Sequence, residues 1–281
     1  QAMIRNLARW LDSKLNRVAR GRGILRLRGA IVAIVVVGIA GSAGYGLELL
    51  ALRIQPGGLV YVGTLLFLIG LRRPVGTMRR TLAALRAGDD TLAASRASAL
   101  VRFDIRGGDR HAVARAAVEG GAARAVEGLF ATIFWFLILG LPGACVHRGL
   151  GAAADAIGRV SPRHADFGFA VARLNDVLSL PGALIAGPVL SIAALFCPGA
   201  SFWRALGGWA RDLAMRGVET GYRAEGAVAG AFGLALGGPR RFDGQTVEGS
   251  WIGDGRARVE IVDVRRAVFL IAIAALLVSL A

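Results

Sequence analysis

A long apolar run at residues 30–52 constrains this chain more than any other feature. It reads AIVAIVVVGIAGSAGYGLELLAL, and about 20 apolar residues are enough for a helix to cross the hydrocarbon core of a bilayer. Further apolar runs lie at 59–71, 129–147, 178–196 and 267–281. The sequence therefore predicts an all-α integral membrane protein, with about five transmembrane or re-entrant helices and amphipathic interfacial helices. These form a single polytopic membrane domain over 1–281.

The charge of the chain is strongly positive and is carried almost entirely by arginine. Lys and Arg total 34 against 19 Asp and Glu, which makes the net charge +15, and Lys14 is the only lysine. The arginines flank apolar runs and do not alternate with aromatic residues, so we expect a lipid bilayer and no nucleic acid as partner. Basic residues crowd the segments 72–127 and 197–266, and the positive-inside rule predicts that both are cytoplasmic.

Residues 3–28 have the pattern of a basic amphipathic helix. Apolar residues recur at helical spacing from Ile4 to Val18, with arginines between them. Such a helix lies on a membrane surface or packs its apolar side on the rest of the protein. The pattern leaves both interpretations open.

Within the run 30–52, small residues recur every four positions. Gly38, Ser42 and Gly46 form a stripe that is typical of close helix packing. The GSAG stretch is therefore interpreted as a packing face and not as a phosphate-binding loop. Glu48, near the end of the run, is either a functional carboxylate or a side chain that reaches the membrane interface.

Glycine and proline interrupt several of the predicted helices. The third apolar run contains Gly140-Leu-Pro-Gly143, and the fourth contains Pro181 and Pro188, which predict a kinked or broken helix. Gly120-Gly121 predicts an interruption in an Ala-rich helix. Residues 257–264 alternate between apolar and polar side chains, which predicts a short strand.

Standard nucleotide and metal motifs are absent from the sequence. There is no Walker loop, no HExxH helix and no Cys/His cluster. Arg115 and Glu119 lie four residues apart, so on a helix they share a face, and by default they form a surface ion pair. Ionisable side chains that are buried at membrane depth predict a functional site, because they are costly there. The candidates are the carboxylates and arginines near the ends of the apolar runs: Asp104, Asp109, Arg115, Glu119, Glu127, Arg173, Asp176 and Glu225.

Three segments carry a resemblance to a known family. In order they are DRHAVARAAVEGGAARAVEGLFATIFWFLILGLPGACVHRGLGAAADAIG, FGFAVARLNDVLSLPGAL and AEGAVAGAFGLALGGPRRFDG. They resemble the adenosylcobinamide-phosphate synthase family, the CobD/CbiB proteins of cobalamin biosynthesis. The resemblance implies a multi-pass protein of the bacterial inner membrane whose substrate-facing loops are cytoplasmic.

The same resemblance implies an amide-forming ligase. Family members join aminopropanol, or its O-phosphate, to a carboxylate of adenosylcobyric acid and give adenosylcobinamide or its phosphate. ATP and Mg²⁺ are the implied cofactors, a corrinoid is the substrate, and other proteins of the corrinoid pathway are expected partners. The chemistry requires an activated carboxylate, cations that offset phosphate charge, and a base that frees the attacking amine.

The resemblance also implies roles for the candidate residues. Asp104, Glu119, Asp176 and Glu225 are the expected catalytic residues, and Asp176 and Glu119 the expected Mg²⁺ ligands. Asp109, Arg115, Glu127 and Arg173 are expected to bind substrate or phosphate. Arg173 and Asp176 lie three apart and share a helix face, although a plain ion pair at a helix end is the alternative interpretation. We expect Glu119, Arg173, Asp176 and Glu225 to converge in one polar hollow.

Several polar positions depart from the family pattern while the apolar frame is kept. Phe103-Asp104-Ile105 stands where the family has Arg-Asp-Thr, and Ala123 and Arg124 stand where it has Glu-Asn. Asn175 replaces an Asp, and Asp155 lies one position late. These losses support a second hypothesis, in which the chain is a catalytically eroded member that acts as a corrinoid-binding scaffold or an AmpE-like membrane regulator.

Overall fold

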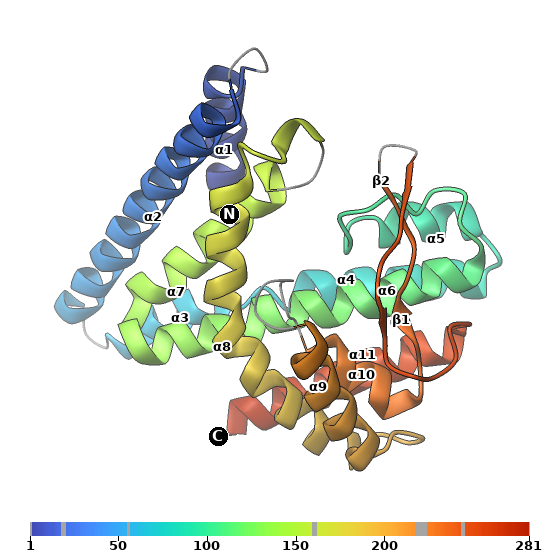
Figure 1. The fold of residues 1–281 in the computed structure, drawn as a ribbon. Coiled ribbons are helices and arrows are strands. Elements are labelled where there is room, and N and C mark those ends of the chain that lie inside the picture. The colour runs from blue at the N-terminus through green and yellow to red at the C-terminus, as the bar shows by residue number, and fades with distance from the viewer. Residues whose placement is uncertain are drawn as a thin grey trace. The chain divides into compact units, whose positions relative to one another are not determined.

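The regular structure of the described part of the chain is helical apart from two short antiparallel strand pairs (Figure 1). The computed structural model describes residues 2–17, 21–54, 57–158, 162–216, 224–242 and 245–280. The helices are α1 (Ala2–Leu15), α2 (Arg22–Arg53), α3 (Gly58–Leu68), α4 (Arg72–Arg86), α5 (Asp90–Ala97), α6 (Arg110–Ala125), α7 (Ala131–Ile157), α8 (Phe169–Ala194), α9 (Phe202–Arg216), α10 (Glu225–Phe232) and α11 (Ile261–Leu280). Val126–Phe130 is a π-helical turn and Pro162–His164 a 3₁₀ turn. Strand β1 (Leu236–Gly237) pairs with β4 (Trp251–Ile252), and β2 (Arg240–Phe242) pairs with β3 (Gln245–Val247).

Helical stretches long and apolar enough to cross a membrane confirm the prediction of an all-α membrane protein. Among the described residues they are Arg22–Arg53, Gly58–Arg86, Arg110–Ile157 and Phe169–Ala194. The fifth apolar run forms α11, which is not one of these stretches. Every 18-residue window of α11 contains Asp263, Arg265 and Arg266, so the helix carries too much charge at its start. The cytoplasmic placement of 72–127 and 197–266 stays a prediction.

The chain forms two compact units. The first consists of residues 1–69 and 130–182, and the second of residues 70–129 and 183–281. That the two act as one membrane domain over 1–281 stays a prediction.

The core of the first unit lies among α1, α2 and α7. Ala8, Val36 and Leu150, one from each of these helices, are fully buried in it. Ile4 and Leu11 of α1 pack against this core. Of the two interpretations of segment 3–28, α1 therefore follows the one in which the apolar side packs on the protein. The segment is not one helix, since α1 ends at Leu15 and α2 begins at Arg22.

The predicted interruption of the third apolar run is confirmed at Gly140 in α7. Gly140 has φ +63° and ψ −152°, and Pro142 has no N–H to give to the carbonyl four residues earlier. Helix α2 comes very close to this point, because a Cβ on Gly44 would lie 2.6 Å from the Cα of Pro142.

Gly38, Ser42 and Gly46 of α2 do not form a packing face within the first unit, so that part of the interpretation was wrong as regards this unit, whereas Gly44 of the GSAG stretch packs closely on Pro142, as a packing face predicts. A Cβ added to Gly38 or Gly46 would meet no described atom within 4 Å, and Ser42 is exposed. The fourth run is not broken, because α8 stays helical across Pro181 and Pro188, and the alternative of a kinked helix stays a prediction. Neighbouring groups and small local adjustments satisfy the backbone around prolines in membrane helices.

In the second unit, α6 runs through Gly120 and Gly121 without the predicted interruption. A Cβ on Gly120 would lie 2.9 Å from the carbonyl carbon of Leu100, and one on Gly121 would overlap the sulfur of Met78. Close packing at these two positions explains why glycine is present, and it outweighs the low helix propensity of glycine. The irregularity comes after α6 instead, in the π-helical turn Val126–Phe130.

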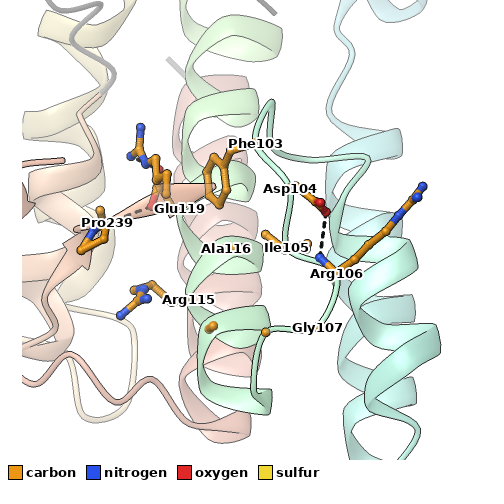
Figure 2. Close-up of a pocket in the computed structure, with 13 residues that line it drawn as sticks. Phe103, Asp104, Ile105, Arg106, Gly107, Arg115, Ala116, Glu119 and Pro239 are labelled. Atoms are coloured by element: carbon orange, nitrogen blue, oxygen red, sulfur yellow. Dashed lines mark hydrogen bonds and ion pairs between the residues drawn. The ribbon is translucent and has the colours of Figure 1, made fainter. Parts of the chain in front are cut away.

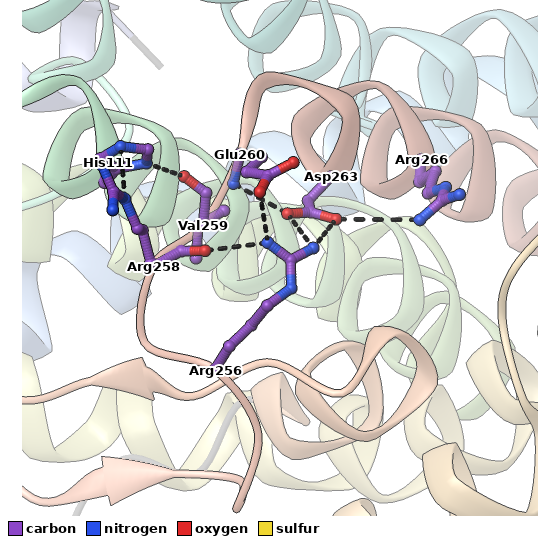
Figure 3. Close-up of polar contacts among 7 residues, drawn as sticks. All are labelled: His111, Arg256, Arg258, Val259, Glu260, Asp263 and Arg266. Atoms are coloured by element: carbon purple, nitrogen blue, oxygen red, sulfur yellow. Dashed lines mark hydrogen bonds and ion pairs between the residues drawn. The ribbon is translucent and has the colours of Figure 1, made fainter.

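The predicted strand at 257–264 is wrong, because this segment leads into α11. Figure 3 shows the contacts that start the helix: the backbone N–H of Glu260 donates to Oδ2 of Asp263 at 2.8 Å, a side-chain cap of the first turn. The segment is tied to α6 by His111, whose Nε2 accepts from Nε of Arg258 at 2.9 Å and whose Nδ1 lies 2.9 Å from the carbonyl oxygen of Val259. Alternating polarity here reflects a capped helix start and not a strand.

Candidate functional site

A pocket of about 150 Å³ in the second unit brings together three of the predicted site residues (Figure 2). Asp104, Arg115 and Glu119 line it. Two further arginines, Arg106 and Arg240, also line it, so three arginines and two acidic residues contribute to its walls. The pocket carries net positive charge, which suits an anionic ligand.

One wall of the pocket is the loop before α6. Asp109 caps α6, since its carboxylate accepts the N–H of Ala112 at 2.7 Å. Asp104 accepts the backbone N–H of Arg106 at 2.9 Å through Oδ1, which closes a tight turn (Figure 2). Gly107 completes this turn at φ +76°, a conformation that favours glycine.

A second wall is one face of α6. Ala112, Arg115, Ala116 and Glu119 follow each other at intervals of three and four, so their side chains share that face. The two alanines leave space between the loop and the charged side chains. Helical spacing therefore explains why Arg115 and Glu119 both reach the pocket, as the sequence predicted.

Glu119 is buried, which corrects the default interpretation of an exposed surface pair. Its side chain is 7% exposed. Oε2 accepts the backbone N–H of Gly237 at 3.1 Å, and Oε1 accepts from Nη2 of Arg240. The carboxylate thus connects α6 to the segment 237–240, which forms the third wall.

Arg240 is the site residue that sequence reasoning missed. Its guanidinium lies over the ring of Phe103, 5.1 Å from the ring centroid. Its Nε is buried and has no hydrogen-bond acceptor among the described residues. The GGPRRFDG stretch contains the signal, because a turn of glycines and proline before paired arginines positions a cation.

Arg115 is held at the pocket by the β1–β4 pair. Its guanidinium lies 5.1 Å from the centroid of the Trp251 ring, and its Nη1 lies 3.4 Å from the carbonyl oxygen of Ala257. Trp251 is the strand partner of Gly237, the residue whose N–H reaches Glu119. One strand pair therefore supports both Arg115 and Glu119.

Three other predicted residues of the second unit, Asp109, Glu127 and Glu225, are not among the pocket-lining residues. Glu127 is buried in the π-helical turn and forms an ion pair with Arg124 at 3.6 Å. Glu225 is buried at the first position of α10. Their predicted roles, like that of the capping residue Asp109, stay predictions.

Arg173 and Asp176 belong to the first unit, where both are partly buried on α8. Asn175, between them, is 1% exposed, and neither atom of its amide has a hydrogen-bond partner among the described residues. One helical turn after Asn175, Oγ of Ser179 lies 3.4 Å from Nε2 of the buried His147. The convergence of Arg173 and Asp176 with Glu119 and Glu225 in one hollow stays a prediction.

Within the described residues no three His, Cys, Asp or Glu side chains are grouped so that they could hold a metal ion. Mg²⁺ does not need such a group, since one or two carboxylates and the phosphates of a substrate usually hold it. The pocket offers Asp104 and Glu119 for this role. The predicted pair Asp176 and Glu119 is divided between the two units.

Comparisons with known proteins identify the family. A family model described as CobD/Cbib protein matches residues 1–271. The chain belongs to the CobD/CbiB family. It is 30% identical over 276 residues to the cobalamin biosynthesis protein CobD of Citrobacter koseri, covering 98% of this chain and 86% of that protein.

Other relatives agree with this assignment. The CobD protein of Rhizobium meliloti is 34% identical over 266 residues, covering 92% of this chain and 80% of that protein. The cobalamin biosynthesis protein CbiB of Salmonella typhi is 29% identical over 277 residues, covering 98% of this chain and 86% of that protein. No solved structure matches the chain.

Proposed function

We propose that this membrane protein acts in cobalamin biosynthesis as an amide-forming ligase. It attaches aminopropanol, or its O-phosphate, to adenosylcobyric acid in an ATP-dependent reaction and gives adenosylcobinamide or its phosphate. Family membership and the names of its relatives support the pathway. The observation that supports the chemistry is the pocket lined by Arg106, Arg115 and Arg240 together with Asp104 and Glu119.

The proposed reaction has two steps. An oxygen of the corrin carboxylate attacks the γ-phosphorus of ATP, and ADP leaves with the electron pair of the broken P–O bond. The amine nitrogen of aminopropanol then attacks the acyl carbon, and inorganic phosphate leaves. The nitrogen loses a proton to a base, so the products are the amide, ADP and phosphate.

The pocket residues fit the charge changes of this reaction. Arg115 and Arg240 offset the charge of a transferring or departing phosphate. Asp104 lies on the exposed side of the pocket, where it is placed to accept the proton of the attacking amine. Mg²⁺, carried on the nucleotide phosphates, would supply further positive charge.

A reconstitution assay tests the proposal. The purified chain in detergent is incubated with adenosylcobyric acid, aminopropanol phosphate and Mg-ATP, and the amide product is measured by mass spectrometry. We expect product from the unaltered chain and roughly a hundredfold less from Arg115→Gln, because removal of one preorganised cation typically costs that much. Arg173→Ala tests in the same way whether the first unit contributes.

A second function is supported by the sequence at the pocket itself. The resemblance implies an arginine at the position of Phe103, and Glu119 is held by both Arg240 and Gly237. Both features suit a corrinoid-binding scaffold or a regulator that has lost catalysis. A chain that binds adenosylcobyric acid but forms no amide in the same assay supports this alternative and contradicts the ligase.

The proposed location is the bacterial inner membrane, with the pocket on the cytoplasmic side. The pocket residues lie in the arginine-rich segments 72–127 and 197–266, and the positive-inside rule favours the cytoplasm for such segments. Labelling of single cysteines at Gly107 and Leu59 in intact cells tests this orientation. We expect a reagent that does not cross membranes to leave Gly107→Cys unlabelled.

A further inference from the structure

Only one of the two donors on one edge of the Arg240 guanidinium has a hydrogen-bond partner among the described residues. Nη2 donates to Oε1 of Glu119, whereas Nε is buried and has no acceptor among the described residues. Nε–H and one Nη2–H point in the same direction along one edge of a guanidinium, and this edge matches two oxygens of a phosphate or carboxylate. The free Nε–H is therefore a vacant half of an anion-binding edge.

Glu119 does not fill that edge, because its two oxygens are shared between two donors. Oε2 accepts the backbone N–H of Gly237 at 3.1 Å, which leaves only Oε1 for Arg240. The Phe103 ring covers a face of the guanidinium at 5.1 Å and so holds its plane. The side chain of Arg240 is 29% exposed and lines the pocket, so a ligand can reach its exposed part, and contact with the buried Nε requires Glu119 to move aside.

We propose that Arg240 is a phosphate-binding residue of this pocket and that Glu119 competes with the phosphate for it. A phosphate oxygen accepts from Nε and a second one displaces Oε1 of Glu119 from Nη2. Glu119 then occupies the place of the ligand and keeps the guanidinium paired while no phosphate is bound. The inference deepens the proposed function, on which it rests for the identity of the phosphate-bearing substrate.

Competition between Glu119 and phosphate for Arg240 predicts a change in phosphate affinity when the charge of Glu119 is removed. A bound phosphate lies next to a buried carboxylate of the same sign, and this repulsion weakens binding. Glu119→Gln removes the charge but keeps a carbonyl oxygen that accepts the N–H of Gly237. We expect this variant to bind phosphate about tenfold more tightly, the size of effect that a close like charge has on an ionic equilibrium.

The test measures binding of radiolabelled inorganic phosphate by equilibrium dialysis of the full chain in detergent, without Mg²⁺ and at constant ionic strength. Glu119→Gln is compared with Glu260→Gln, a matched control that removes one acidic charge from the same unit outside the pocket. Arg240→Lys keeps the charge and loses the two-donor edge, and Arg240→Gln loses both. The double variant Glu119→Gln/Arg240→Gln shows whether the effect of Glu119 passes through Arg240.

The expected result is tighter binding in Glu119→Gln, no change in Glu260→Gln, weaker binding in both Arg240 variants, and no gain from Glu119→Gln when Arg240 is absent. Equal or weaker binding by Glu119→Gln, with its thermal unfolding unchanged, overturns the competition. Wild-type affinity in Arg240→Gln overturns the assignment of Arg240.

Failure of the ligase proposal gives a different pattern. If that proposal alone is wrong, the unaltered chain forms no amide product while the phosphate affinities still follow the expected order. If Glu119 instead serves as a Mg²⁺ ligand, added Mg²⁺ increases phosphate binding in the unaltered chain and not in Glu119→Gln. That increase, without tighter binding of Glu119→Gln in the metal-free dialysis, contradicts the competition.

Discussion

Nη2 of Arg256 lies 2.7 Å from both carboxylate oxygens of Asp263, and the Asp263 side chain is completely buried (Figure 3). The same carboxylate accepts the N–H of Glu260, so one acid both starts α11 and joins it to the segment after β4. Arg256 is 40% exposed, so the pair lies at the edge of the core. Removing the acid leaves the arginine partly solvated, and the cost is smaller than for a fully buried pair.

We therefore expect Asp263→Asn to lower the free energy of unfolding by about 2 kcal/mol. Glu260→Gln is the matched control, because Glu260 is 59% exposed and lies 3.6 Å from Arg256. An exposed pair of this kind contributes at most about 0.5 kcal/mol. Thermal unfolding in detergent compares the two variants, and equal losses would contradict the structural role of Asp263.

The break in α7 predicts a contrast between two glycines of the first unit. Gly140→Ala places a side chain at φ +63°, with its Cβ 3.0 Å from the carboxylate oxygens of Glu48. We expect a loss of about 2 kcal/mol, since such backbone conformations cost about 1–3 kcal/mol for residues other than glycine. Gly38→Ala has open space around the new Cβ and ordinary helical backbone, so it should be neutral or stabilising by up to about 1 kcal/mol. Thermal unfolding measures both variants, and a neutral Gly140→Ala would contradict the observed break.

The Cys197 thiol predicts a pH dependence of stability. Burial raises the pKa of this thiol, and the nearby Arg266 guanidinium lowers it by less. A thiol whose pKa is higher in the folded than in the unfolded chain stabilises the fold fully below the unfolded pKa, which is about 8.5. That contribution is lost as the pH rises through the folded pKa.

Cys197→Ala should therefore lose less thermal stability than the unaltered chain between pH 7 and pH 10. The midpoint of unfolding is measured at both pH values, with Cys145 retained in both proteins. A larger drop in the variant would show that the thiol is not kept protonated by burial.

The contact between Trp251 and Arg115 predicts that substitution of the ring weakens phosphate binding. The ring supports the guanidinium of Arg115 at 5.1 Å, and such contacts contribute about 0.5–1 kcal/mol at partly exposed sites. Trp251→Leu should weaken phosphate binding about threefold, whereas Trp251→Phe keeps an aromatic face and most of the affinity. Equilibrium dialysis measures the phosphate affinity of both variants. Equal affinities of Trp251→Leu and Trp251→Phe would show that the aromatic ring does not position Arg115.

The helical membrane class could be predicted from the sequence because it depends on local properties. The apolar runs at 30–52 and 178–196 have about the length of a bilayer crossing, and the GLPG stretch predicts the interruption of α7 at Gly140. The shared face of Arg115 and Glu119 follows from helical spacing alone. The family could also be recognised, because three motifs keep their order along the chain.

What only the tertiary structure decided depends on contacts between distant segments. Gly120 and Gly121 predicted an interruption of α6, yet Leu100 and Met78 pack against them and the helix continues. Arg240 lies 121 residues from Glu119 in the sequence, and no local pattern links the two. A buried charge takes its partner from whichever segment the fold brings within reach, so the anion-binding edge of this pocket appears only once the chain is folded.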